Sequence, residues 1–522
     1  MSIKNALPKT NWPAILIIVL AAVLRLACLG IRPPHFDEGV NGWFVDQITK
    51  TGFYHYDPEN YHGPLHFYVL FIFQTLFGRH AWALRLPIVI VSTFTVWLVT
   101  RFDRFLGNRT SLLAALAMAV SPAAVFYGCY AIHESWLALF LMLTVWGLFG
   151  LWSEGKKNYL IAVATGVTGM ILTKETYFIH LGCFILAGIC LNIFERFSPS
   201  SPLPRARQLW SNRDLTIVLL LSLIAIVFFY SGTFLDWSSL VGMPVEQLTH
   251  ASVRTILKSN PLLHTFVLWG NTGNEGHGHE KPFGYWLTLL FRYEWIAFIG
   301  LAGSLRYLWP STNRHVRYLA IYGTGAFLAY SIIHYKTPWC IITIIWPFFF
   351  VFGNLTDELW RKFDSRIAIG LVTCLCAAAL ASTIRLSFFH YTDEDEPYVY
   401  VHTTNDLNKL THPLFELVAR DPSNYHLKGS ILLPSYHPLP WVLGDFTAIG
   451  YYDEDHTPET MDADFLIVDK SRIEEVELSL KQEYFADTFK LRGSMDTGML
   501  YLNASKFRVL FPSRQPEFTP RP

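Results

Sequence analysis

PLHFYVLFIFQTLF, residues 64–77, is the stretch on which the membrane topology of the whole chain depends. It is apolar but only 14 residues long, and Gly78, Arg79 and His80 close it. A helix needs about 20 apolar residues to cross a bilayer, and about 17 at the least. The shorter length is typical of an interfacial or re-entrant helix. We therefore expect residues 64–77 to lie at the membrane without crossing it.

The composition indicates many membrane spans around this stretch. Of the 522 residues, 52% are hydrophobic and 16% are charged, whereas a soluble protein usually carries about 25% charged residues. Apolar runs of suitable length lie at residues 12–30, 82–100, 111–128, 134–152, 158–173, 176–194, 215–233, 285–305, 318–334, 339–355 and 367–385. The sequence therefore predicts an α-helical multi-pass membrane protein with about 11 transmembrane helices and additional interfacial helices.

The distribution of lysine and arginine tests this topology. If residues 64–77 do not cross, most basic residues, including Arg101, Arg104, Lys156 and Lys157, collect in loops on the N-terminal side, and the longer opposite loops carry few. The positive-inside rule then places the N-terminus in the cytoplasm. If the stretch crossed, every later loop would change sides and the bias would vanish. We expect a protein of the cytoplasmic membrane whose C-terminal part is extracytoplasmic.

Six polar motifs fall on the same, extracytoplasmic side in this topology. They are HFDEG (35–39), YHGPLH (61–66), AIHES (131–135), LTKET (172–176), EGHGHEKPFGYW (275–286) and HYKTPW (334–339). Apart from their few lysines, these motifs do not contribute to the lysine and arginine bias that determines the topology. Their shared face therefore predicts one functional site there.

The acids of these motifs are the candidate catalytic residues: Asp37, Glu38 and Glu134. Acids near a membrane are costly unless they are solvated or functional, and a carboxylate within reach of a hydroxyl can act as a general base. The alternative for Asp37 and Glu38 is a hydrated loop end, and for Glu134 a favourable charge at a helix start.

The donors of the same motifs are candidate substrate-binding residues, because cations and imidazoles suit an anionic headgroup such as a lipid phosphate. The donors are His62, His133, Lys174, His279, Lys281, Tyr285 and Lys336, and the acid Glu175, next to Lys174, is a further candidate substrate-binding residue. The alternatives are a structural turn at residues 61–66, an ion pair of Lys174 with Glu175, and snorkelling of Lys336. Arg25 and Arg85 lie within predicted spans and need partners in space.

The sequence predicts neither a cofactor nor a nucleic-acid partner. No Walker A, GxGxxG, GxSxG or HExxH pattern occurs, so nucleotide hydrolysis and the common protease mechanisms have no support. His277 and His279 form an H-x-H pair without further ligands at metal spacing. We expect no built metal site, although a divalent cation at Asp37 and Glu38 stays an alternative.

The character of the chain changes at about Phe388, where shorter segments replace the long apolar runs. Residues 398–402, 430–436, 463–469 and 498–503 read as strands, and residues 405–420 and 471–485 as helices. We expect a transmembrane domain at 1–387 and a small extracytoplasmic α/β domain at 388–522.

RPPHFDEGVNGWFVDQI (32–48), followed by HGPLHFYVLFIF (62–73), resembles the Asp-Glu loop and HPPL helix of the GT-C glycosyltransferases. The branch is that of the dolichyl-phosphate-mannose-protein mannosyltransferases, with protein O-mannosyltransferases and aminoarabinose transferases. YAIHESWLALF (130–140), LTKET and HYKTPWCIITIIWP (334–347) resemble its later motifs in order. Gly63, Glu134 and Glu175 depart from the usual proline, aspartate and glycine. The departures indicate a divergent member, similar to the glycan flippase-activity-associated family.

The resemblance implies a glycosyltransferase (a hexosyl or pentosyl transferase) that uses a sugar on a polyprenyl phosphate. Asp37 would be the general base that activates a hydroxyl of a lipid, glycan or protein acceptor for inverting attack, and Glu134 would position a substrate. Fixed cations would stabilise the leaving lipid phosphate; the candidates are Lys174, His279, Lys281 and Lys336. The alternative is a non-catalytic partner in glycan-lipid flipping or export. An oligosaccharyltransferase is disfavoured because the tail has no WWD-type motif.

Overall fold

The computed structural model describes residues 11–60, 62–197, 207–243, 255, 259–275, 278–308 and 313–520. The chain divides into two compact units. Unit 1 comprises Met1–Leu29, Ile48–Gly78 and Trp82–His390, and unit 2 comprises Gly30–Gln47, Arg79–Ala81 and Tyr391–Pro522.

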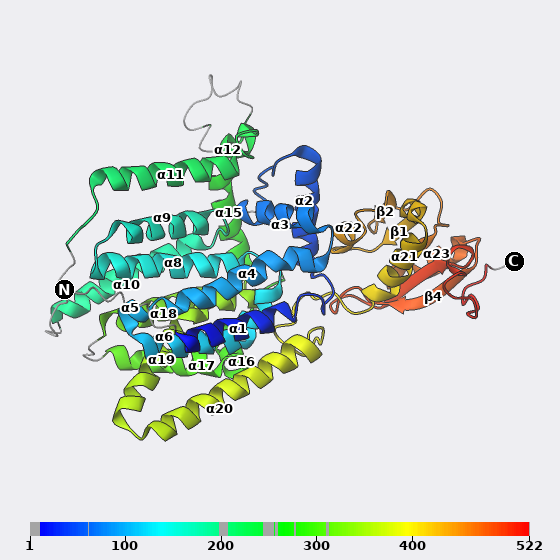
Figure 1. The fold of residues 1–522 in the computed structure, drawn as a ribbon. Helices are drawn as coiled ribbons and strands as arrows, with labels where there is room; N and C mark the ends of the chain where they lie inside the picture. Colours follow the sequence, from blue (N-terminus) through cyan, green and yellow to red (C-terminus); the bar gives the residue numbers. More distant parts are fainter. Residues whose placement is uncertain are drawn as a thin grey trace, which may run out of the picture. The chain divides into compact units, whose positions relative to one another are not determined.

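Unit 1 is built of helices, and most of the long ones run alongside one another (Figure 1). In chain order they are α1 (Trp12–Leu26), α3 (Leu65–Phe77), α4 (Ala81–Thr100), α5 (Asp103–Leu106), α6 (Asn108–Val120), α7 (Pro122–Phe126), α8 (Glu134–Ser153), α9 (Lys157–Ile171), α10 (Tyr177–Phe197), α11 (Asn212–Tyr230), α12 (Trp237–Val241), α15 (Pro261–Glu275), α16 (Tyr285–Tyr293), α17 (Trp295–Ser304), α18 (Arg314–Ile332), α19 (Ile341–Lys362) and α20 (Ser365–Ile384). Helix α19 packs against α6, α17 and α18. Of the most apolar part of the stretch that contains α19, 89% is buried inside the protein, whereas only 11% of the most apolar part of α11 is buried. The core of unit 1 therefore surrounds α19.

Six helical stretches within the described residues are long and apolar enough to cross a membrane. They are Ala81–Leu106, Glu134–Ser153, Tyr177–Phe197, Asn212–Tyr230, Pro338–Lys362 and Ser365–Phe389, and Asn108–Val120 with Pro122–Cys129 makes a seventh if this pair, bent by 61°, is one span. The chain is thus a helical multi-pass membrane protein. Helices also occupy the other ranges expected to span, but they are shorter, interrupted or less apolar.

One interruption, at Glu294 between α16 and α17, has a clear cause. The carboxylate of Glu294 accepts hydrogen bonds from Ser121 Oγ (2.8 Å) and from the backbone N–H of Ala123 (2.6 Å). These groups lie at the start of α7, where backbone N–H groups have no intrahelical partner. The break in one helix therefore provides the N-terminal cap of another.

Helix α3 forms on the short apolar stretch. It spans 13 residues, Leu65–Phe77, and ends at Gly78, whose φ of 83° suits a residue without a Cβ atom. At 1.5 Å per residue its length is about 20 Å, against about 30 Å for the hydrocarbon core of a bilayer. The length agrees with the expectation that this helix does not cross.

The buried arginines find partners in unit 1. Arg25 Nε donates to Ser92 Oγ (2.7 Å), and its other nitrogens donate to backbone carbonyls, including that of Ala21 (3.1 Å). Arg85 donates to the carbonyl of Leu29 at 2.9 Å. Both side chains are fully buried. These hydrogen bonds are the partners that the two arginines need inside predicted membrane spans.

Unit 2 contains a five-stranded mixed sheet in the order β2-β1-β3-β5-β4. Strands β1, β2 and β3 are parallel, whereas β5 is antiparallel to both β3 and β4. The strands are β1 (Lys428–Leu432), β2 (Ala448–Tyr452), β3 (Phe465–Val468), β4 (Tyr484–Phe489) and β5 (Gly498–Asn503), and the helices are α2 (Phe36–Thr51), α21 (Leu407–Arg420), α22 (Leu439–Val442), α23 (Ile473–Ser479) and α24 (Ala504–Phe507). Alternate residues of β3 enter opposite cores: Phe465 and Ile467 pack with α21, and Leu466 and Val468 pack with α23.

The helices α21 and α23 and the strands β1, β3 and β5 confirm the predicted elements. The strand predicted at 398–402 is wrong: Val401 has a φ of 54°, and the segment bonds to the chain before α2 instead. The Tyr400 carbonyl lies 2.9 Å from His35 Nε2, and Thr403 Oγ1 donates to Pro34 O (2.6 Å). Strand β2 was missed, and β4 overlaps the end of the region predicted as helix at 471–485.

Unit 2 also includes two segments from the N-terminal part of the chain, 30–47 and 79–81. Arg79 explains the second, because its guanidinium pairs with Asp46 (2.6 Å) and with Asp445 (3.0 Å). No local pattern in the sequence predicts ion pairs between residues so far apart in the chain.

Candidate functional site

Two turns of unit 1 are joined by their backbones. The N–H of Gly63 donates to the carbonyl of Thr173 (3.2 Å), and the N–H of Leu65 donates to that of Leu172 (3.0 Å). A Cβ atom at Gly63 would lie 2.3 Å from the carbonyl carbon and oxygen of Leu172. The HGPL turn therefore needs glycine here, and this contact brings His62 to the turn that carries Lys174 and Glu175.

Lys174 forms a buried ion pair. Its Nζ donates to Glu134 Oε1, and the two side chains are 8% and 2% exposed. The thiol of Cys340 lies 3.9 Å from the same carboxylate oxygen. Burial opposes the charge on Lys174, but Glu134 and Glu175 together hold the pKa of its ammonium well above the ordinary value. The lysine is charged at neutral pH and already has a carboxylate partner.

Glu175 pairs with His62 on the other side of Lys174. The distance from His62 Nδ1 to Glu175 Oε2 is 2.8 Å. Burial favours the neutral acid, but His62 and Lys174 hold the pKa of Glu175 below its usual value. An ionised carboxylate only accepts hydrogen bonds, so Nδ1 of His62 carries the proton. The cluster thus runs from Glu134 through Lys174 and Glu175 to His62.

Three imidazoles lie in contact beside this cluster, with their rings tilted against one another. The ring of His133 lies 4.5 Å from that of His62 and 4.2 Å from that of His66, between centroids. His66 Nε2 lies 3.2 Å from the carbonyl of Ala131 and therefore donates to it. Nε2 of His133 is buried and has no hydrogen-bond partner among the described residues.

A second group gathers around Lys336. An isolated antiparallel β-bridge between Glu280 and Tyr335 joins the chain around Lys281 to the chain around Lys336. The N–H of Lys281 donates to the carbonyl of His334 (3.2 Å), and the N–H of Lys336 donates to the carbonyl of His279 (3.1 Å). His279, Lys281 and Lys336 are therefore neighbours in the chain's fold. His277 lies outside the described residues.

The ammonium of Lys336 is buried in this second group. It donates to the backbone carbonyls of Lys281 (3.1 Å) and Ile333, and burial lowers its pKa. In the part of the chain that the structure describes, no carboxylate lies within 4.0 Å of it. Tyr285, four residues after Lys281, begins α16, and its backbone N–H donates to the carbonyl of Pro282 (3.0 Å).

Glu38 and His35 cap helix α2 in unit 2. Glu38 Oε2 accepts from the N–H of His35 (2.9 Å), and Nδ1 of His35 accepts from the N–H of Asp37 (3.0 Å). This reciprocal pattern is that of a capping box. It accounts for the burial of Glu38, which is 1% exposed.

Asp37 differs from Glu38, because its carboxylate accepts no hydrogen bond from any described residue. It faces two basic side chains of unit 2 electrostatically, Arg492 and His437. Burial lowers the pKa of both bases, and Asp37 opposes the effect. The guanidinium of Arg492 lies 4.8 Å above the ring of Phe36. Asp37 is therefore a half-buried acid beside the guanidinium of Arg492 and the imidazole of His437, and its oxygens are available for a ligand.

Comparison with known proteins finds a family match in part of the chain. Residues 61–230 match the family described as "Dolichyl-phosphate-mannose-protein mannosyltransferase". The match includes both joined turns and the Glu134–Lys174 pair. YkcB of Bacillus subtilis (strain 168), whose name provisionally assigns it to the mannosyltransferases, is 25% identical over 158 residues; the match covers 28% of this chain and 22% of YkcB.

Solved structures share the fold over nearly the whole chain. The structure of ArnT from Cupriavidus metallidurans bound to undecaprenyl phosphate aligns with a TM-score of 0.61 and 14% identity, over 96% of this chain and 99% of ArnT. Its apo state gives the same TM-score at 12% identity, over 95% and 98%. The chain thus has an ArnT-like fold.

The predicted site residues of this chain fall into two sets. The acids Asp37 and Glu38 belong to unit 2, and the remaining ones belong to unit 1. Within unit 1 the structure brings His62, His133, Glu134, Lys174 and Glu175 together, and it joins His279, Lys281 and Lys336 in a second group. Within the described residues, no three His, Cys, Asp or Glu side chains are arranged to hold a metal ion.

Several residues of these groups were not singled out by sequence reasoning. His66 was visible in YHGPLH as a companion of His62, but its role as the third ring in contact depends on His133. Cys340 looked like an apolar residue of a span. Arg492 and His437 carry no local signal, because Asp37 lies hundreds of residues earlier in the chain.

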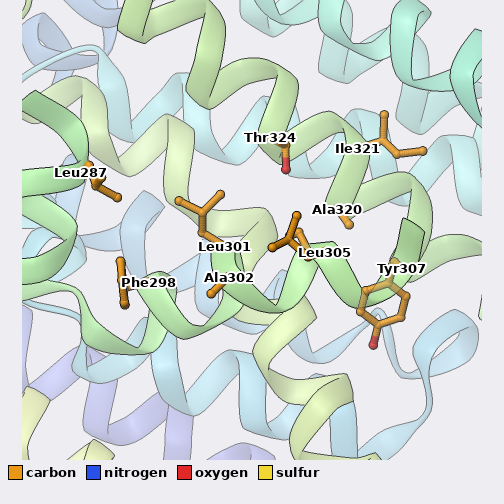
Figure 2. A pocket seen from close by; sticks show the side chains of 10 residues that line it. Leu287, Phe298, Leu301, Ala302, Leu305, Tyr307, Ala320, Ile321 and Thr324 are labelled. Carbon is orange, nitrogen blue, oxygen red and sulfur yellow. The ribbon is translucent and has the colours of Figure 1, made fainter. Parts of the chain in front are cut away.

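A separate apolar pocket of about 440 Å³ lies among α16, α17 and α18 (Figure 2). Its lining residues are Leu287, Phe298, Leu301, Ala302, Ser304, Leu305, Tyr307, Ala320, Ile321 and Thr324. None of them is charged and none belongs to the polar groups described above. The pocket therefore offers no acid, base or cation for catalysis.

Proposed function

We propose that this protein transfers a sugar from a polyprenyl phosphate to an acceptor hydroxyl. The carrying observation is the Glu134–Lys174–Glu175–His62 cluster, which lies within the residues that match the mannosyltransferase family. Burying charges is expensive even when they are paired, so the three buried charged residues Glu134, Lys174 and Glu175, with the partly exposed His62 beside them, are a strong functional candidate. The solved structure of ArnT with undecaprenyl phosphate supports the lipid class of the donor.

The two groups of unit 1 have different charges and would serve different parts of the donor. Glu134 and Glu175 outnumber Lys174, so this group suits sugar hydroxyls, which donate hydrogen bonds to carboxylates. Lys281 and Lys336 carry the positive charge that suits the phosphate, and His279 lies beside them as a further hydrogen-bonding group. Lys174, which was expected to contact the phosphate, already pairs with Glu134 and would act by holding that carboxylate in place.

Asp37 is the proposed general base. The acceptor oxygen attacks the anomeric carbon, the bond from that carbon to the phosphate oxygen breaks, and the lipid phosphate leaves with the electron pair. The acceptor proton passes to the carboxylate of Asp37. Cations near the leaving phosphate lower the barrier, since its negative charge grows in the transition state.

The topology belongs to the same proposal. We infer eleven crossings, a cytoplasmic N-terminus, a transmembrane domain at 1–387 and an extracytoplasmic domain at 388–522, so that the reaction faces away from cytoplasmic nucleotides. Support comes from the lysine and arginine bias and from the short helix α3. A reporter fused after Pro522 should read as extracytoplasmic; a cytoplasmic signal would refute this arrangement.

The test of the function uses the purified full-length chain in lipid nanodiscs with a panel of radiolabelled polyprenyl-phosphate sugars and a panel of lipid, glycan and peptide acceptors that carry free hydroxyls. The wild type should release polyprenyl phosphate, and Asp37→Asn should slow this by about 10²- to 10⁴-fold without weaker lipid binding. Glu38→Gln is the matched control, because glutamine keeps an acceptor for the helix cap; it should retain activity. Equal turnover of wild type and Asp37→Asn would refute the base.

A non-catalytic binder of lipid phosphate is the second candidate. It is favoured by the neighbouring Lys281 and Lys336, which suit a lipid phosphate whether or not the sugar is transferred. Lipid binding without turnover of any donor in the same panel would decide for it.

A further inference from the structure

His133 has a polar atom that the fold does not use. The residue is 3% exposed, and its Nε2 has no hydrogen-bond partner among the described residues. More than about 90% of buried polar groups in proteins have such a partner, because an unmet one loses its bonds to water without replacement. An exception beside a functional cluster calls for a ligand as its explanation.

The two neighbouring imidazoles show what a structural role would look like. His66 donates from Nε2 to the carbonyl of Ala131, and His62 donates from Nδ1 to Glu175. His133 lies between these two rings and takes part in neither bond. Phe67 covers it further, with ring centroids 5.3 Å apart.

The surroundings also fix the charge of His133. Burial and the nearby His66, His62 and Lys174 all act against an imidazolium, and they hold the pKa of His133 well below its usual value. The carboxylate of Glu134 pairs with Lys174, and that of Glu175 pairs with His62. A neutral imidazole offers one donor and one acceptor, which matches a hydroxyl and adds no charge for a phosphate.

We propose that His133 is a specificity-determining residue whose Nε2 hydrogen-bonds a hydroxyl of the sugar carried on the polyprenyl phosphate. The inference rests on the proposed function and adds an atom that reads the sugar. Glu134, next in the chain, supplies a carboxylate beside the same ligand. The ligand class is therefore a neutral sugar with at least one hydroxyl directed to these rings.

Binding to lipids with and without the sugar isolates this contact. The probes are undecaprenyl phosphate, and the same lipid carrying mannose, glucose or galactose, each titrated into the full-length chain in nanodiscs. The wild type should bind at least one glycosylated lipid more tightly than the bare lipid. His133→Phe should reduce this preference by about 3- to 10-fold, the usual worth of one hydrogen bond, and leave the affinity for the bare lipid unchanged.

Stability separates this role from a structural one. His133→Phe removes an unpaired polar atom, so its Tm should stay at or above the wild-type value. The control His66→Phe breaks the bond to Ala131 and should lower the Tm. His133→Gln, which keeps a polar terminus and avoids a second ring, should restore part of the sugar preference.

Two results would overturn the inference: an unchanged sugar preference in His133→Phe, or a loss of Tm as large as that of His66→Phe. A wild type that distinguishes none of the glycosylated lipids from the bare lipid would instead refute the proposed function, and the inference with it. The two failures are thus distinguishable in one set of titrations.

Discussion

Replacing Lys174 by methionine should destabilise unit 1 by about 3–5 kcal/mol, the usual cost of removing one partner of a buried ion pair. Methionine has a similar length, so the change removes the charge without leaving a large cavity. Glu134 then stays 2% exposed and loses its cation, and Glu175 loses one of the two groups that favour its charge.

The cost should depend on pH. Without Lys174, each buried carboxylate can reduce the penalty by binding a proton, and a shift of one pKa unit corresponds to about 1.4 kcal/mol. The variant should therefore lose less stability at pH 5 than at pH 8. In the wild type the pKa of Lys174 is raised, so its contribution is complete below the unfolded value and constant across this range.

The assay is reversible unfolding in mixed micelles of the wild type, Lys174→Met, Glu134→Gln and the double variant, at both pH values. Glutamine cannot carry the charge that the missing lysine leaves unpaired, so the double variant should recover at least about 2 kcal/mol relative to the sum of the single changes. Single changes below about 1 kcal/mol that add without coupling would refute the buried ion pair.

Three further predictions concern the same unit. Gly63→Ala should lower the free energy of unfolding by about 1–3 kcal/mol, because its Cβ atom would lie 2.3 Å from Leu172. The control is Gly182→Ala, because Gly182 has open space around it. Equal free energies of unfolding for the two variants would contradict the joined turns. Lys336→Met should weaken undecaprenyl phosphate binding by about 10- to 100-fold in equilibrium titration, and an unchanged affinity would place the phosphate elsewhere. The lowered pKa of Glu175 contributes stability that is present above its unfolded value and is lost as the pH falls through the folded one; acid unfolding of Glu175→Gln should lack this loss, and an identical acid profile would contradict it.

Local patterns in the sequence predicted the parts of the fold that depend on neighbouring residues. The apolar run at 65–77 and the heptad-like leucines of α21 each form their helix without reference to distant contacts. The motifs also predicted that His62 and Lys174 lie on one face, and the structure joins the two turns that carry them by backbone hydrogen bonds.

Contacts between distant residues were not predictable in the same way. The side chains of residues 398–402 alternate as in a β-strand. Hydrogen bonds between this part of the chain and His35 and Pro34 nevertheless hold it in an irregular conformation. Glu38 looked like a catalytic partner of Asp37, but a histidine in place of the usual serine or threonine hid the capping box. Arg492 reaches Asp37 only through folding of unit 2.

The backbone bonds between the turns at Gly63 and Thr173 have an evolutionary consequence. Main-chain atoms make these bonds, so the side chains at positions 62 and 175 can change without separating the turns. Natural variants that carry a glutamate at 175 should therefore substitute 62 and 175 as a pair, since a lone Glu175 would remain buried without its histidine. Such paired replacement would let relatives exchange one substrate preference for another on an unaltered scaffold.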